Sequence, residues 1–184
     1  ILDPALHETR FTYDSQWNRV TTITDAFNQV TEFTYDPANG NLLTVKDPLN
    51  QVTTIGYNDF GQPLSVQGPI ATEPPTTFAY DVVSRLLSLT DPRGLVTQFR
   101  YDSLNRVTDI ADAQQGLTRF TYDPNGNLLS VTDAKHQTTT YTYDNMDRLK
   151  TCTDAPNRQE SYQHHTTGRR TALTSLDGAG TCYA

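Results

Sequence analysis

The fold is decided by the stretch Phe120–Thr132, which reads FTYDPNGNLLSVT. Its first three residues alternate apolar, polar and apolar, which is the periodicity of a β-strand. Residues 123–127 have turn chemistry, because aspartate accepts hydrogen bonds from nearby backbone amides, proline presets φ and glycine accepts a positive φ. Residues 128–132 form a second short apolar segment. The stretch therefore predicts a β-hairpin.

A second turn and a lead-in to the next strand complete the unit. Residues 133–137 read DAKHQ, which is again typical of a turn, and residues 138–140 are three threonines. Each segment between turns is about five residues long, the usual length of a strand and far below that of a helix. Two strands and two turns thus fill the unit and leave no room for a helix.

The same unit recurs along nearly the whole chain, and repeats of this kind determine a fold. An aromatic-x-Tyr-Asp signature marks each copy, and its tyrosines are 21 to 23 residues apart. The third copy is a variant, Ile55-Gly56-Tyr57-Asn58, in which isoleucine replaces the leading aromatic and asparagine replaces the aspartate. The signature residues, for which we predict a structural role, are Tyr13, Asp14, Tyr35, Asp36, Tyr57, Tyr80, Asp81, Tyr101, Asp102, Tyr122, Asp123, Tyr143 and Asp144.

A second aspartate landmark defines the boundaries of the copies. It lies eight residues before the leading aromatic of the next copy, and Gly68 takes its place in the third copy. The nine residues 69–77 then read as an insertion within a turn. We predict the tail of a preceding repeat over residues 1–10, seven hairpin repeats over 11–161 and a degenerate eighth repeat over 162–184.

These units predict an all-β fold, in which tandem hairpins form a curved or spiralling antiparallel sheet that is a segment of a larger shell or solenoid. Large open sheets twist and curl. The buried face is undecided, since Leu128 and Val131 have opposite parity relative to Tyr122. Either both faces are partly covered or a β-bulge intervenes.

Composition excludes several classes of function. The formal net charge is −7 and there is no basic stripe, so we expect no nucleic-acid partner. No apolar run is long enough to span a bilayer. Cys152 stands in a slot that other repeats fill with valine, isoleucine or leucine, so a buried free thiol is expected, with a disulfide to Cys182 as the alternative.

The sequence predicts no catalytic, metal or cofactor site. Its aspartates occupy repeated turn slots, which indicates backbone capping, whereas a catalytic residue would be expected once. Turns such as 123–127 lack the glutamate and the full ligand count of a calcium loop, and the four histidines lack metal-ligand spacing. Trp17 and the tyrosines offer surfaces for stacking on sugar rings, although stacking between repeats is favoured.

The signature resembles that of the RHS/YD-repeat family. The copies that carry the resemblance best are residues 35–42 (YDPANGNL), 101–107 (YDSLNRV) and 122–128 (YDPNGNL). The resemblance implies a long β-ribbon wound into a hollow shell, which in bacterial members encloses a toxic C-terminal domain and in the animal teneurins serves adhesion. The absence of an Asn-x-Ser/Thr glycosylation acceptor favours the bacterial branch.

The resemblance leads us to expect a non-enzymatic, secreted or cell-surface wall segment. Its partners would be the rest of a longer chain or identical neighbours, and an enclosed toxin. The alternative is an extracellular adhesive, glycan-binding or fibre-forming array, because exposed strand edges are templates for pairing.

Overall fold

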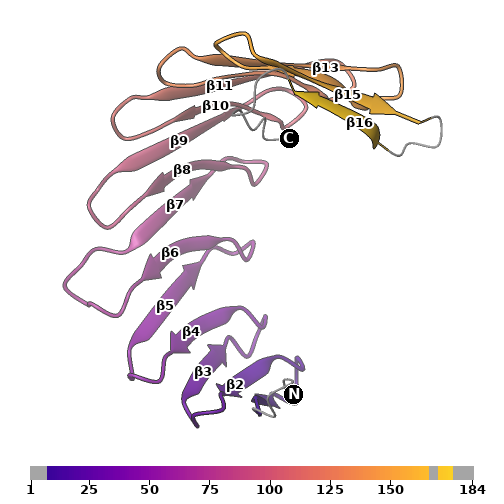
Figure 1. Ribbon diagram of the computed structural model, residues 1–184. Coiled ribbons are helices and arrows are strands. Elements are labelled where there is room, and N and C mark those ends of the chain that lie inside the picture. Colours follow the sequence, from indigo (N-terminus) through magenta and orange to yellow (C-terminus); the bar gives the residue numbers. More distant parts are fainter. Residues whose placement is uncertain (1–7, 166–169, 176–184) are drawn as a thin grey trace. The chain divides into compact units, whose positions relative to one another are not determined.

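The computed structural model describes residues 8–165 and 170–175, and these residues form strands and turns. The chain divides into two compact units, Ile1–Leu95 and Val96–Ala184. Within each unit every strand pairs antiparallel with the next along the chain, as Figure 1 shows. The predicted all-β fold of tandem antiparallel hairpins is therefore confirmed, while the curvature of the whole ribbon stays a prediction.

Eight strands lie in each unit. Those of the first unit are β1 (Arg10–Tyr13), β2 (Val20–Thr24), β3 (Val30–Tyr35), β4 (Leu42–Lys46), β5 (Val52–Tyr57), β6 (Pro63–Gln67), β7 (Thr76–Tyr80) and β8 (Leu86–Thr90). Those of the second unit are β9 (Val96–Tyr101), β10 (Val107–Ala111), β11 (Leu117–Tyr122), β12 (Leu128–Thr132), β13 (Thr138–Tyr143), β14 (Leu149–Thr153), β15 (Gln159–His164) and β16 (Arg170–Ser175).

One cross-strand register is repeated in every hairpin. The leading aromatic lies opposite an apolar residue of the second strand, as Phe120 lies opposite Val131. Directly opposed residues share one face of a sheet and interact there. We call the face that carries these pairs the aromatic face. Its pairs are Phe11–Ile23, Phe33–Val45, Ile55–Val66 and Phe78–Leu89 in the first unit, and Phe99–Ile110, Phe120–Val131 and Tyr141–Cys152 in the second.

A β-bulge resolves the parity of Leu128 and Val131. Thr121 lies opposite Ser130, but Tyr122 lies opposite Leu128, so Leu129 is the extra residue. Both Leu128 and Val131 consequently lie on the aromatic face. The register shifts at the signature tyrosine of the other hairpins as well. Of the two alternatives that parity left open, the bulge is confirmed.

The opposite face is lined by hydroxyl groups. Directly opposed threonines or serines form hydrogen bonds of 2.6 Å between their hydroxyl oxygens, as Thr34 and Thr44 do. The other such pairs are Thr12–Thr22, Thr121–Ser130 and Thr142–Thr151. These pairs add cross-strand interactions on this face, which also carries Val30, Val52, Val96 and Leu117.

Both turns of the repeat share one geometry. In the first turn, the Gly126 amide donates to the Asp123 carbonyl and the Asp123 amide donates to the Asn127 carbonyl. In the second turn, the amides of His136 and Asp133 make the corresponding bonds. In each turn, the fourth of the five residues has a left-handed backbone conformation, with φ of 98° at Gly126 and 62° at His136. This combination, a turn followed by a left-handed residue, is a common hairpin loop.

The insertion of the third copy is a loop between β6 and β7. Its bounds differ from the prediction, because β7 begins at Thr76 and pairs with β6 through Thr76–Val66 and Thr77–Ser65. The side-chain amide of Gln67 donates to the carbonyls of Gly68, Ile70 and Glu73. One glutamine thus holds the loop, and the register of the following hairpin is unchanged.

The sheet of each unit is a single layer. Among the described residues, only two apolar side chains are buried, Tyr141 at 7% exposed and Cys152 at 0%. Cys152 is disulfide-bonded, so the prediction of a free thiol is wrong. Sequence spacing could not show this, because a disulfide depends on a spatial approach of a few ångströms. The only other cysteine, Cys182, lies outside the described residues.

The degraded eighth copy also starts with a hairpin, made of β15 and β16. Tyr162 keeps the aromatic slot opposite Leu173, and His164 takes the place of the signature tyrosine at the register shift. Residues 1–7, 166–169 and 176–184 lie outside the described residues. The boundaries between the repeats therefore stay a prediction.

A glycine substitution tests the left-handed turn position. A Cβ at Gly126 would meet no atom within 4 Å, so Gly126→Ala changes only backbone conformation. A left-handed conformation costs a residue with a Cβ about 1–2 kcal/mol. We expect Gly126→Ala to lower the free energy of unfolding by about that amount in urea denaturation.

Gly68→Ala is the matched control for this experiment. Its Cβ would also meet no atom within 4 Å, but Gly68 does not have a positive φ. This substitution should leave the stability unchanged. Equal effects of the two substitutions would contradict the turn geometry.

Candidate functional site

The signature tyrosines connect successive hairpins through their hydroxyl groups. The hydroxyl of Tyr122 donates a hydrogen bond of 2.9 Å to the backbone carbonyl of Val107, fifteen residues earlier. Three other tyrosines make the same bond, Tyr35 to Val20, Tyr57 to Leu42 and Tyr143 to Leu128. We call these four bonds the tyrosine ladder.

The carbonyl that accepts each ladder bond lies beyond the end of a strand pairing. The pairing of β10 with β11 begins at Asp109, two residues after Val107. The pairing of β12 with β13 likewise begins at Ser130, two residues after Leu128. The following strand therefore does not pair with these residues, and a tyrosine hydroxyl satisfies their carbonyls. Phenylalanine could fill the same space but could not donate this bond.

Two signature tyrosines do not join the ladder within the described residues. The hydroxyl of Tyr80 makes no hydrogen bond there, and its hairpin follows the loop between β6 and β7. Tyr13 stands in the first described hairpin and is 55% exposed.

The signature aspartates cap their own turns. One carboxylate oxygen of Asp102 accepts hydrogen bonds from the backbone amides of Leu104 and Arg106, at 2.8 and 3.0 Å. Asp81 and Asp144 bind the amides two and four residues ahead in the same way. The second-turn aspartates, such as Asp91 and Asp133, do so as well. Asn58 replaces aspartate in the third copy and keeps the same two bonds.

This capping lowers the pKa of several aspartates. Hydrogen bonds from backbone amides, first of all from the amide four residues ahead, lower the pKa of Asp81, Asp91 and Asp102. The pKa of Asp144 falls to about 2, mainly because the Arg148 side chain donates to its carboxylate and then because of backbone amides. A carboxylate with these partners is a structural anion, and its proton affinity is too low for a general base near neutral pH.

The last residue of the first turn connects neighbouring turns. Arg106 donates to the Asp102 carboxylate at 2.7 Å and to the backbone carbonyl of Asp123 in the next repeat at 2.8 Å. Its guanidinium also lies 4.6 Å from the centroid of the Tyr122 ring. Arg19, Gln62, Asn127 and Arg148 also bond to the next first turn. Sequence reasoning missed these contacts, although a long polar side chain recurs at this position.

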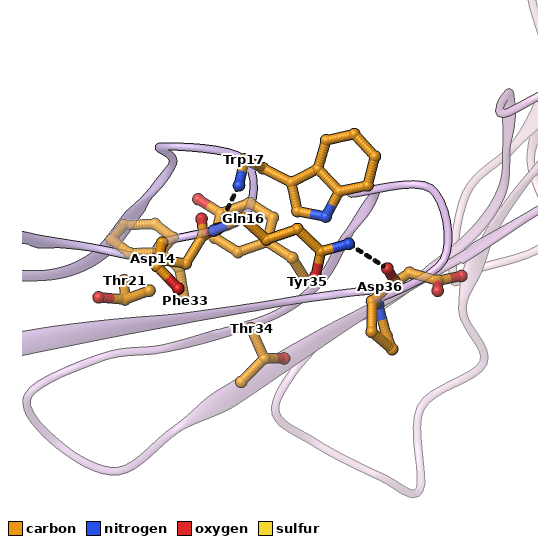
Figure 2. Close-up of a pocket in the computed structure, with 10 residues that line it drawn as sticks. Asp14, Gln16, Trp17, Thr21, Phe33, Thr34, Tyr35 and Asp36 are labelled. Atoms are coloured by element: carbon orange, nitrogen blue, oxygen red, sulfur yellow. Dashed lines mark hydrogen bonds between the residues drawn. The ribbon is translucent and has the colours of Figure 1, made fainter.

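A shallow pocket lies between the first turns of the two N-terminal hairpins (Figure 2). Its lining includes Trp17, Phe33, Tyr35 and Asp36. Trp17 is 40% exposed, and a Cβ placed on Gly40 would approach its ring to 3.1 Å. The indole therefore packs against the next turn, and the Asp14 carboxylate is occupied by backbone amides, including that of Trp17 at 2.5 Å.

The described residues contain neither a metal-binding cluster nor a helix that could span a membrane. Across residues 8–165 and 170–175, no group of three or more His, Cys, Asp or Glu side chains is arranged to hold a metal ion. Within the same described ranges there is also no helix with the length and hydropathy needed to cross a membrane.

Removal of one ladder hydroxyl should weaken the contact between two hairpins. Tyr122→Phe keeps the ring and its contact with Arg106 but leaves the Val107 carbonyl without its donor. A hydrogen bond of this kind contributes about 1 kcal/mol net. We expect faster native-state hydrogen exchange in β10 and β11, by roughly fivefold at that free energy.

Tyr80→Phe is the matched control, since it changes the same signature slot where no ladder bond exists. Exchange in β7 and β8 should stay as in the parent chain. Equal acceleration by both substitutions would show that the hydroxyl bond contributes nothing.

Stability should fall in acid because the pKa of these aspartates is lower in the folded state. Their stabilising contribution is complete above the unfolded pKa of about 3.9. It is lost as the pH falls through the folded value, about 2 for Asp144. The urea midpoint should be constant above about pH 5 and decline between about pH 4 and 2.

Asp144→Asn isolates one contribution to this acid dependence, because the variant keeps an acceptor oxygen but does not titrate. Its midpoint should be lower than that of the parent near neutral pH and should change less between pH 4 and 2. A parent midpoint that did not vary between pH 5 and 2 would contradict the capping role.

Comparison with solved structures shows the same fold in several of them. A TcdB2-TccC3 structure matches with a TM-score of 0.74 and 17% identity over 91% of this chain and 11% of that chain. TcdB2-TccC3-Cdc42 matches with a TM-score of 0.73 and 16% identity over the same shares. The pore of the Photorhabdus luminescens Tc holotoxin has a TM-score of 0.68 and 18% identity, over 92% of this chain and 10% of that chain. The chain thus spans about a tenth of the length of these solved chains.

Comparison with protein families gives the assignment. No curated protein matches the chain. The RHS repeat family matches residues 35–69, 80–117 and 122–157, which together make up more than half of the chain. These segments contain six of the seven signature tyrosines. The chain therefore belongs to the RHS repeat family.

Proposed function

We propose that this chain is a non-enzymatic wall segment of a bacterial β-shell that encloses a polypeptide cargo. The observation that carries the proposal is the single-layer sheet whose aromatic face is partly exposed. Phe33, Phe99 and Phe120 lie on that face and are only partly covered. A sheet with an apolar face requires a covering layer, and an enclosed polypeptide would supply one.

The two faces differ in the way that a wall requires. Apolar pairs such as Phe120–Val131 lie on one face, and bonded hydroxyls such as Thr121–Ser130 lie on the other. We assign the aromatic face to the interior of the shell and the hydroxyl face to its outside. Residues 11–161 would supply seven hairpins to this wall.

The chemistry of the repeat supports a passive role. Each signature aspartate holds backbone amides of its own turn, and the linking side chains, such as Arg106 and Arg148, bond to the next turn. These groups connect the hairpins to one another. The mechanism that we propose is therefore confinement, in which the wall separates its cargo from solvent, proteases and the producing cell.

The family and the comparisons support the proposed setting. One of the similar solved structures is by its name a Tc holotoxin pore of Photorhabdus luminescens, and it contains TccC3, which is also present in the TcdB2-TccC3 structure. A toxin is accordingly the cargo that we propose, with export to the cell surface or the medium. The disulfide at Cys152 supports an oxidising compartment.

Electron microscopy of the native assembly that contains this chain tests the proposal. A closed hollow particle with density inside is the expected result. An extended filament or an open ribbon would refute the shell and favour the fibre-forming or adhesive array. An empty closed particle that never copurifies with a second polypeptide or domain would refute the cargo.

A further inference from the structure

The link between neighbouring first turns is missing at one junction of the first unit. The last residue of a first turn usually bonds to the following turn, as Arg19 does to the Gly40 carbonyl. Asn41 ends the next first turn, and its side-chain amide makes no hydrogen bond within the described residues. A Cβ placed on Gly61 of the following turn would lie 3.7 Å from the Asn41 Nδ2 atom. The asparagine side chain thus approaches the following turn without bonding to it.

A pocket of about 460 Å³ lies at this junction. Its lining includes Asp36 and Asn41 from one turn, Asp59 from the next, and Tyr57. The equivalent pocket at the preceding junction (Figure 2) is smaller, at about 320 Å³, and there Arg19 stands at the position of Asn41. The missing link therefore coincides with a wider space between the turns.

The linked junctions show which group fits between two first turns. The guanidinium of Arg106 donates to the Asp123 carbonyl at 2.8 Å and lies 4.6 Å from the centroid of the Tyr122 ring. Arg19 also bonds to its following turn, and its guanidinium lies 5.5 Å from the centroid of the Tyr35 ring. A guanidinium donates hydrogen bonds in its plane while its face stacks on an aromatic ring. The repeat therefore contains a position for a guanidinium beside the signature tyrosine.

We propose that the pocket at the Asn41 junction binds a guanidinium group, supplied by an arginine side chain of a partner polypeptide. Tyr57 makes the same ladder bond as Tyr122, so its ring holds the equivalent position. The Asp123 carbonyl accepts a turn bond and a second bond from Arg106. The equivalent Asn58 carbonyl accepts only its turn bond within the described residues, so it can accept one more. This inference is independent of the proposed function.

The charges around the pocket favour a cation and indicate its source. Asp36 and Asp59 line the pocket, and none of its described lining residues is basic. The Asp59 side chain is exposed and has no hydrogen bond or ion pair in the described part of the chain, so it can bind a guanidinium. The α-carboxylate of free arginine would be repelled by these aspartates, whereas the peptide backbone around an arginine residue is uncharged. The charges therefore favour an arginine within a polypeptide.

Titration of the isotope-labelled full chain with N-acetyl-arginine amide, followed by NMR, tests the site. The backbone amide signals of residues 57–61 should shift and saturate. The signals of the equivalent residues 122–126 should stay in place, because Arg106 fills that junction. Absence of shifts at residues 57–61, or equal shifts at residues 122–126, would overturn the proposal.

Two further compounds separate the guanidinium from its charge and its source. N-acetyl-lysine amide has the same charge without the planar group and should bind about fivefold more weakly. Equal binding of the lysine compound would contradict a guanidinium site. Free arginine should also bind more weakly than the blocked compound, and equal or tighter binding would exclude a polypeptide as the source.

Asn41→Arg supplies the missing guanidinium from within the chain. This variant should lose the shifts at residues 57–61 and should unfold at a higher urea concentration, because the link between the turns is restored. Unchanged binding of the arginine compound by this variant would refute the assigned position.

Asp59→Asn is a second variant, at an exposed position that no fold contact requires. It should weaken binding of the arginine compound severalfold, since a charge-assisted hydrogen bond is lost. Glu73→Gln makes the same change of charge outside the pocket and should leave binding unchanged. Equal binding by the parent chain and both of these variants would show that the pocket does not hold the cation.

Discussion

The hydrogen bond from the tyrosine hydroxyl to the preceding hairpin is the interaction on which the array depends. An isolated hairpin is marginal, and a single-layer sheet offers it no second layer to pack on. The pairing of the second strand with the following hairpin stops short of the residue opposite the signature tyrosine. The carbonyl of that residue, as at Leu128, is bound instead by the next tyrosine hydroxyl. Neighbouring hairpins thereby become each other's core, as the nearest-neighbour stability of repeat proteins requires.

Much of the local structure could be predicted from sequence, because it depends on residues close together in the chain. The alternation in residues 120–122 and the turn chemistry of residues 123–127 predicted the hairpin. The opposite parity of Leu128 and Val131 left two alternatives for the buried face, a β-bulge or two partly covered faces. The similarity of the two turns was harder to see. Gln115 and His136 adopt left-handed backbones without being glycine or asparagine, because the aspartate that begins each turn holds the geometry.

Contacts between repeats could not be predicted, because they depend on how far the sheet places one turn from the next. Arg106 contacts its own turn, the next turn and the next tyrosine, yet its position in the sequence shows only a polar residue at the end of a turn. The disulfide at Cys152 could not be predicted either, because the residue stands in a slot that valine fills in other repeats and this favours a free thiol. The partial exposure of the aromatic face likewise depends on contacts between strands that the sequence does not show.

The loop between β6 and β7 has a consequence for how such a chain changes over time. Each hairpin re-establishes its own alignment at its aspartates and its bulge, so a longer connection at residues 68–75 leaves the strands on either side in register. An insertion or deletion in a connection therefore changes only that connection. The array can therefore acquire new surface segments one connection at a time, and a mutation that alters one such segment need not be compensated elsewhere in the array.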